Sequence, residues 1–167
     1  MADEDWADRH VARWRNHWID VTFDDEIEAV FVRIGRIGRH LRQAKQEAAA
    51  VVGMQDHEYD TLHELMIRDT PGAASPSALA GDLGISGAGM TGRLDALEKA
   101  GWVQRRTTAG DRRRVQVEVT RAGSAKWRET MELRGRAEEE LIAELTPRER
   151  RALAELLKKL TLAAGDL

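Results

Sequence analysis

Hydrophobic residues recur every three to four positions along most of the chain, and this spacing predicts a mainly helical protein. The longest such stretch covers residues 24–52, where an acidic first turn precedes one apolar stripe and Gly53 supplies a helix-ending residue. A shorter helix is predicted at residues 56–67. Its four inward positions are Tyr59, Leu62, Leu65 and Met66.

Two further helix starts lie close together after this stretch. Ser75 and Pro76 combine a capping hydroxyl with proline at the first helical position. Ser86 can cap a second helix that ends near Gly101, and Gly84 provides a tight turn between the two helices. The inward positions of the second helix are Met90, Leu94 and Leu97. Two short helices joined by a glycine-containing turn are typical of a helix-turn-helix.

The hydrophobic spacing changes to two after Trp102. Residues 103–107 and 113–120 alternate, and Ala109-Gly110-Asp111 between them has turn chemistry, so a β-hairpin is predicted. Five arginines make this hairpin basic, namely Arg105, Arg106, Arg112, Arg113 and Arg114. A basic hairpin beside a helix-turn-helix is typical of the wing of a winged helix-turn-helix, which contacts DNA phosphates or a narrow minor groove.

Helical spacing returns at both ends of the chain. Thr120 or Gly123 precedes a helix predicted to run to about residue 145. Residues 146–149 form a capping box that starts a last helix, whose leucines are Leu153, Leu156, Leu157, Leu160 and Leu162. Near the N-terminus, the spacing of Trp6, Val11, Trp14 and Trp18 predicts an extra helix that packs its rings on the body.

Charge and composition narrow the functional classes. The 26 basic and 29 acidic residues give a net charge of −3, so any DNA-binding surface must be a local basic patch on an acidic body. The absence of cysteine excludes disulfides, thiol redox sensing and cysteine-ligated metals. No apolar run is long enough to span a bilayer, and the polar start lacks a secretory pattern, so a cytoplasmic protein without a membrane partner is expected.

The predicted DNA-binding residues lie on the second helix of the pair and on the wing. Small residues at the helix start allow close approach to the groove, free N–H groups there can meet phosphate, and Thr91 is the main short polar reader. On the wing, Asp111 can hold the Arg112 guanidinium in one orientation before double-stranded DNA arrives. The full predicted set is Ser86, Gly87, Ala88, Gly89, Thr91, Arg93, Arg106, Asp111, Arg112 and Arg113.

Four motifs resemble those of the multiple-antibiotic-resistance regulator family, MarR, within a match over roughly residues 24–162. They are Leu79-Ala80 with Gly84-Ile85-Ser86, then Thr91-x-Arg93-Leu94-x-x-Leu97-Glu98-x-x-Gly101-x-Val103-x-Arg105, then Asp111-Arg112-Arg113, then Val119-Thr120-Arg121-Ala122-Gly123. The resemblance implies a homodimer with interlocked terminal helices, in which each subunit supplies one winged lobe to a pseudo-palindromic operator, most commonly as a repressor.

This resemblance also implies an organisation of one continuous domain. Residues 1–22 would form an N-terminal extension helix, residues 23–53 and 124–167 the dimerisation helices, and residues 54–123 the winged helix-turn-helix lobe that binds DNA.

Within the family, the chain is most similar to the urate-responsive HucR/PecS branch. The residues that match its ligand site are Trp14, with Trp18 as the competing register, and Asp60, Arg93 and Arg105. The resemblance implies an anionic aromatic ligand such as urate, which needs a guanidinium for its charge and a ring for its flat face. Asp60 would pair with Arg105 in the empty site and pass its displacement to Arg93.

The sequence is also compatible with other effectors and with other classes of site. The effector could be another aromatic or organic acid or a regulatory metal, or there could be no ligand. His57 and His63 are six residues apart, which does not place both on one helical face, so a metal site has little support. An enzyme is not expected, because the chain has no glycine-rich phosphate loop, nucleophile elbow or HExxH motif, and no cofactor is expected.

Overall fold

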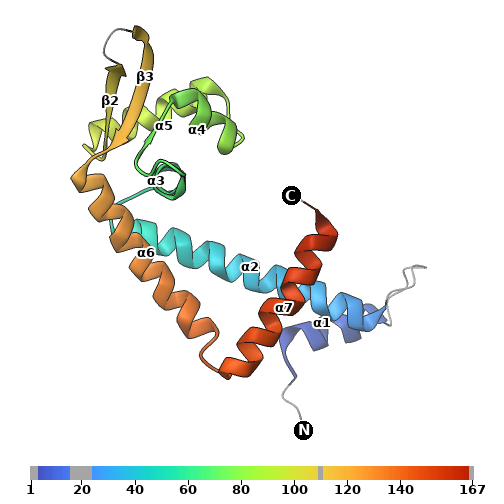
Figure 1. The fold of residues 1–167 in the computed structure, drawn as a ribbon. Coiled ribbons are helices and arrows are strands. Elements are labelled where there is room, and N and C mark those ends of the chain that lie inside the picture. The colour runs from blue at the N-terminus through green and yellow to red at the C-terminus, as the bar shows by residue number, and fades with distance from the viewer. Residues whose placement is uncertain (1–3, 16–23, 109–110, 166–167) are drawn as a thin grey trace. The chain divides into compact units, whose positions relative to one another are not determined.

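A winged lobe built from three helices and a small antiparallel sheet lies in the larger of two compact units (Figure 1). The units are residues 1–44 and 45–167, and the computed structural model describes residues 4–15, 24–108 and 111–165. The lobe helices are α3 (Asp56–Ile67), α4 (Pro76–Asp82) and α5 (Gly87–Lys99). The strands, in the spatial order β1-β3-β2, are β1 (Ala73–Ala74), β2 (Val103–Thr108) and β3 (Asp111–Val119). The predicted helix-turn-helix and β-hairpin are confirmed.

Local capping explains why the helices start where they do. Ser75 Oγ accepts a hydrogen bond from Ala78 N–H, and Thr146 forms the predicted capping box with Glu149. The alternative left open at the start of the long helix α6 (Arg121–Leu141) is resolved, because Thr120 Oγ1 accepts a hydrogen bond from the backbone N–H of Gly123 at 3.1 Å. Thr120 is therefore the cap.

The lobe core is formed by apolar side chains from every element of the lobe. Leu62 and Leu65 of α3, Leu79 of α4, Leu94 of α5 and Val117 of β3 are all fully buried. The cluster also includes residues from outside the lobe, namely Ala49 and Val52 near the end of α2 (Asp25–Val51), with Trp127, Met131 and Leu133 of α6 packed against it. Helices α2 and α6 therefore help to complete the lobe's core.

Two details differ from the prediction. Helix α6 ends at Leu141 rather than near residue 145, because Thr146 must be extended to cap α7 (Pro147–Ala164) and the intervening residues form a turn. Met66 is only half-buried, and Thr61 is buried on α3 instead. The Thr61 hydroxyl donates to the His57 carbonyl at 2.8 Å, which satisfies its polar atom inside the core.

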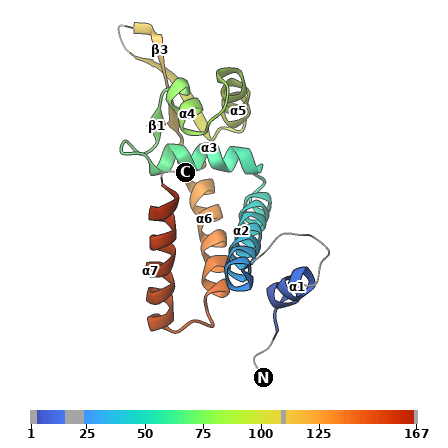
Figure 2. The ribbon, with the colours of Figure 1, turned by 90° about the vertical axis from the view of Figure 1, so that its right-hand side faces the viewer.

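Helix α6 leads away from the lobe, and α7 runs back after the turn (Figures 1 and 2). Helix α7 has no buried residue. Its exposed leucines include Leu153, Leu156, Leu157 and Leu160. An amphipathic helix with an uncovered apolar face needs a partner surface. Within the described residues, no helix combines the length and apolarity needed to cross a membrane.

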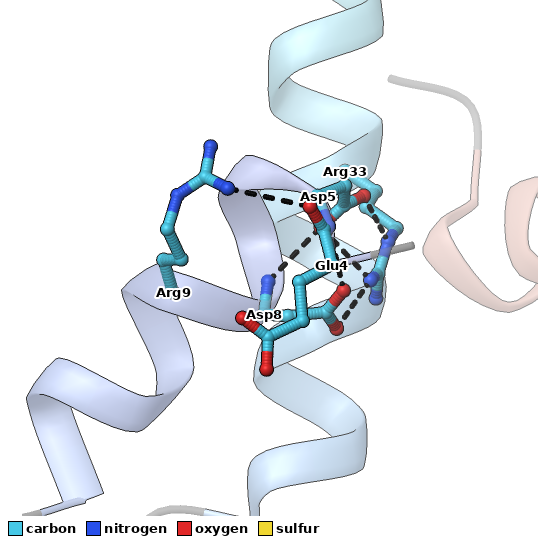
Figure 3. A network of polar contacts seen from close by, with 5 residues as sticks. All are labelled: Glu4, Asp5, Asp8, Arg9 and Arg33. Carbon is cyan, nitrogen blue, oxygen red and sulfur yellow. Dashed lines mark hydrogen bonds and ion pairs between the residues drawn. The ribbon is translucent and has the colours of Figure 1, made fainter. Parts of the chain in front are cut away.

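The smaller unit pairs the extension helix α1 (Trp6–Arg15) with the first part of α2. Arg33 of α2 donates two hydrogen bonds to the Asp5 carboxylate, at 2.9 and 3.1 Å, and a third to Asp8 at 2.7 Å (Figure 3). The Arg33 hydrogen bond holds the pKa of Asp5 at about 2. The guanidinium of Arg36 lies over the Trp6 ring, 5.3 Å from its centroid. The predicted extra helix is confirmed from Trp6 to Arg15, and Trp18 lies outside the described residues.

Candidate nucleic-acid interface

The first turn of α5 exposes the small residues that the sequence assigns to DNA. Residues 86–89 are all exposed, whereas Met90 is fully buried. Ser86 Oγ accepts a hydrogen bond from the backbone N–H of Gly89 at 3.1 Å, so this side chain serves as the helix cap. The N–H groups of a first helical turn have no acceptor within the helix, and they favour anions. The arrangement therefore allows a phosphate to approach the backbone closely.

Thr91 and Arg93 follow on the second turn of α5. The exposed Thr91 hydroxyl donates to the Gly87 carbonyl at 2.9 Å. Its proton is therefore engaged within the helix, and its lone pairs are left to accept hydrogen bonds from base amino groups. Arg93 is half-buried. Direct base reading by Thr91 thus stays a prediction, restricted to an acceptor role.

The wing is an antiparallel pair in which Arg105 lies opposite Val117 and Arg106 opposite Gln116, with a register shift between Thr107 and Thr108. Arg106 pairs with Glu118 across the hairpin at 2.8 Å. The predicted DNA-contacting residues near the tip are Asp111, Arg112 and Arg113 of β3. The structure does not describe the side chains of these three residues. Their contact with DNA stays a prediction.

Arg105 is held by α5 rather than by Asp60. Its guanidinium pairs with Asp95 at 2.7 Å and with Glu98 at 2.9 Å, both on α5. The predicted Asp60–Arg105 pair is therefore wrong. Asp95 and Glu98 face the first wing strand and hold Arg105 on that side of the helix.

Asp60 pairs with a different cation. Lys45, near the end of α2, contacts Asp60 at 2.7 Å and Asp56 at 2.9 Å. Burial works to lower the pKa of Lys45, but the hydrogen bonds with Asp60 and Asp56 outweigh it and the pKa is raised. Lys45 thus ties α2 to the first half of α3.

A polar cluster between α3 and α6 was missed at the sequence level. Trp127 Nε1–H donates to His63 Nδ1 at 3.1 Å, and Arg134 donates to the Tyr59 hydroxyl at 3.1 Å. The Tyr59 and His63 rings stack with centroids 5.3 Å apart. Burial lowers the pKa of His63, and the charge of Arg134 lowers it further. The available signal was the four-residue spacing of Tyr59 and His63, which places both on one helical face.

The remaining candidates do not complete an effector site. Trp14 lies half-buried on α1, with its ring 5.8 Å from that of His10, in the unit of residues 1–44. Its placement beside Asp60 and Arg105, which belong to the other unit, stays a prediction. Among the described residues, no group of three or more histidine, aspartate and glutamate side chains could hold a metal ion.

Comparison with known proteins identifies the family. Residues 52–114 match the model described as MarR family. The chain is 31% identical over 147 residues to the HTH-type transcriptional regulator PecS of Dickeya dadantii (strain 3937), covering 88% of this chain and 87% of that protein. The chain belongs to the MarR family. It is therefore a MarR-family transcriptional regulator and not an enzyme.

Solved structures agree with the winged helix-turn-helix of this MarR-family regulator. YusO of Bacillus subtilis superposes with a TM-score of 0.70 at 18% identity, covering 84% of this chain and 97% of that one. A mutant of Escherichia coli MarR complexed with operator DNA superposes with a TM-score of 0.61 at 25% identity, covering 84% and 99% of the two chains. The first match shows a similar fold and no more. The second is a relative whose structure was solved in complex with operator DNA.

Proposed function

We propose that this MarR-family regulator acts in the cytoplasm as a homodimeric repressor that binds a pseudo-palindromic operator. In this proposal a small anionic aromatic ligand, such as urate, releases the protein from DNA. The observation that carries the DNA-binding part is the exposed, small-residue start of α5 beside the β2–β3 hairpin. The relative solved with operator DNA supports the same use of the lobe.

In this function α5 enters the major groove and the wing lies along the adjacent backbone. The contacts are divided between the helix residues Ser86, Gly87, Ala88, Gly89, Thr91 and Arg93 and the wing residues Arg106, Asp111, Arg112 and Arg113. Homodimerisation is supported by the uncovered apolar faces of α2 and α7. On α2 these exposed residues are Ile27, Val30, Phe31, Ile34 and Ile37, and on α7 they include the leucine stripe.

DNA binding is tested with Arg112→Ala. The variant is expected to weaken binding to every DNA sequence and to lower the slope of log affinity against log salt by about 1, because one phosphate contact is lost. Fluorescence anisotropy at several salt concentrations measures both quantities. Arg148→Ala, on α7 outside the lobe, is the matched control and is expected to keep the wild-type slope. An unchanged slope in Arg112→Ala would count against the wing assignment.

The effector part rests on the resemblance of Trp14, Asp60, Arg93 and Arg105 to the urate-responsive branch. A ring and a guanidinium suit a planar anion. Since Arg105 is paired with Asp95 and Glu98, an anion that reaches it must compete with two carboxylates. Such competition can couple ligand binding to the helix that reads DNA, provided that the ligand prefers the DNA-free arrangement.

Urate is expected to quench tryptophan fluorescence and to release DNA from the wild-type protein. The double variant Trp14→Ala/Arg105→Ala is expected to lose both responses, and a full wild-type response in this variant would remove the proposed pocket. A thermal-shift comparison of urate, xanthine, salicylate and divalent metals separates the alternatives, because only a ligand of the native state raises the melting temperature. If only salicylate or only a metal raised the melting temperature, the effector would belong to that ligand class and not to the urate class.

A further inference from the structure

Arg105, near the start of the first wing strand β2, contacts one face of α5. Thr91, Asp95 and Glu98 are spaced by four and three residues, so they lie in a row along the helix. All three contact Arg105 of β2. Asp95 and Glu98 do so through their carboxylates, and Thr91 through its carbonyl, which accepts from the guanidinium at 3.4 Å. A single arginine therefore spans two turns of the recognition helix.

Glu98 differs from the other two because it uses both carboxylate oxygens. One oxygen accepts a hydrogen bond from the backbone N–H of Arg105 at 3.0 Å, and the other accepts from its guanidinium at 2.9 Å. Glu98 thus fixes the main chain of β2 as well as the side chain. Asp95 is the more exposed partner, at 59% against 39% for the Glu98 side chain, and it contacts the guanidinium alone. The contacts of Arg105 with Thr91, Asp95 and Glu98 are called the brace below, and Glu98 is its only member that holds both the main chain and the side chain of Arg105.

The brace lies where a small rotation has a large effect. Thr108 at the end of β2 lies three positions beyond Arg105, which corresponds to about 10 Å of extended strand. A rotation of roughly 10° at the brace would move the end of β2 by about 2 Å, and a charge-assisted hydrogen bond does not survive a displacement of that size. Under the proposed function, the angle between β2 and α5 would consequently affect which phosphates the wing reaches.

We propose that Glu98 is a positioning residue that sets the angle of the wing on the recognition helix and so determines operator affinity. The inference rests on the proposed DNA-binding function. Arg105 then serves in the brace rather than as a free cation, because the carboxylates of Asp95 and Glu98 neutralise its charge. Glu98 acts through Arg105 and the wing and touches no DNA.

Removal of the Glu98 carboxylate should change DNA affinity in opposite directions, depending on whether Glu98 acts by charge alone or by positioning the wing. Removing a carboxylate from a surface that binds a polyanion should strengthen binding, since repulsion is lost. If Glu98 positions the wing, its removal should weaken binding and lower the salt slope, because wing–phosphate contacts are lost together. Glu98→Gln loses the same charge as Glu98→Ala but keeps an oxygen that can accept the Arg105 N–H. The pair of variants therefore separates charge from position.

The experiment measures anisotropy with a duplex that the wild-type protein selects from a random-sequence library. Glu98→Ala is expected to bind this duplex about ten-fold more weakly and with a smaller salt slope, and Glu98→Gln is expected to lie between it and the wild type. Circular dichroism and thermal unfolding confirm that each variant is folded. Should Glu98→Ala fail to fold, the isosteric Glu98→Gln decides, since electrostatics alone predicts tighter binding for it.

The outcomes distinguish the inference from the function on which it rests. If the wild-type protein selects no sequence and binds no DNA, the proposed function is wrong. If the wild type binds and both Glu98 variants bind equally well or more tightly, Glu98 is not a positioning residue, and the DNA-binding function still stands. Equal weakening in both variants, with an unchanged salt slope, would also overturn the positioning role.

Discussion

The groups around His63 favour the neutral form of its imidazole, because they lower its pKa. Its Nδ1 atom accepts a hydrogen bond from Trp127 and therefore cannot carry a proton. The charged groups around it are Asp60 and Glu64 on α3, Arg134 on α6 and Lys45 on α2. Burial is the larger cause of its lowered pKa, and Arg134 is the second. Protonation of this imidazole at Nδ1 would therefore break one of the hydrogen bonds that join α3 to α6.

The pH dependence of stability follows from that shift. The unfolded chain takes up the His63 proton as the pH falls through about 6.5, whereas the folded chain takes it up only at lower pH. The stabilising effect is complete above the unfolded pKa and is lost as the pH falls through the folded one. His63→Asn keeps an acceptor at the Nδ1 position and removes the titration. We expect the wild type to lose more stability than this variant between pH 7.5 and pH 5.5.

Urea unfolding at the two pH values measures the difference. His57→Asn is the matched control, because His57 is exposed on the same helix, and it should follow the wild-type pH dependence. A wild-type profile that coincides with that of His63→Asn would contradict the assigned role.

The sequence predicts helix caps more reliably than it predicts ion-pair partners. Ser75, Ser86 and Thr146 were correctly identified as caps, because a cap bonds within three residues and its geometry is local. The partner of Asp60 was not predictable in this way. Lys45 and Arg105 were both available cations, and only the packing of α2 against α3 selects Lys45. The brace on Arg105 was missed for the same reason.

At the scale of the elements, the joint between the wing and α6 is closely packed. A Cβ atom added to Gly123 would lie 2.1 Å from the carbonyl oxygen of Trp102. The same oxygen accepts a hydrogen bond from the backbone N–H of Thr120 at 2.9 Å. The start of α6 is therefore pressed directly against the main chain that enters β2. Because the obstacle is backbone, it cannot move aside as a flexible side chain could.

Gly123→Ala is consequently expected to lower the free energy of unfolding by about 1–3 kcal/mol, the usual effect of overpacking. Gly135→Ala, on the same helix, would place its Cβ more than 4 Å from any heavy atom beyond its own stretch of helix, and it should raise stability by about 1 kcal/mol through helix propensity. Chemical denaturation of the two variants checks both signs. Equal stability of Gly123→Ala and Gly135→Ala would show that the joint yields more easily than its geometry indicates.

The types of element were predicted well and their ends less well. The periods of 3.6 and 2 identified the helices and the hairpin, because each period reflects one buried face. The end of α6 was misplaced because Ile142 and Leu145 extend the apolar pattern beyond the helix, while the cap at Thr146 requires a turn before it. A pattern of burial alone does not locate such a boundary.

At the scale of the whole molecule, most of the large apolar side chains that are exposed among the described residues lie on α2 and α7. On α7, positions 153, 156, 157 and 160 share one face at about 100° per residue, whereas position 162 points to the opposite side. The exposed fraction is 58% at Leu156 and 74% at Leu162. The proposed homodimer would cover the first face and leave the second in water.

Leu156→Glu is therefore expected to shift the protein from dimer to monomer at micromolar concentration, since a carboxylate would be buried without a partner. Leu162→Glu introduces the same charge on the opposite face and should remain dimeric. Sedimentation velocity over a range of concentrations distinguishes the two. A wild-type protein that sediments as a monomer would refute the homodimer itself, and a dimeric Leu156→Glu would exclude this face of α7 as the interface.

The bare first turn of α5 has a consequence for how an operator would be chosen. Gly87, Ala88 and Gly89 carry no long side chain that could match the donor and acceptor pattern of a base pair. Under the proposed function, few base pairs would be distinguished letter by letter. Selection would then rest largely on how easily a sequence bends and narrows its minor groove. The operators of such a regulator would resemble one another in how easily the DNA deforms more than in their exact base sequence.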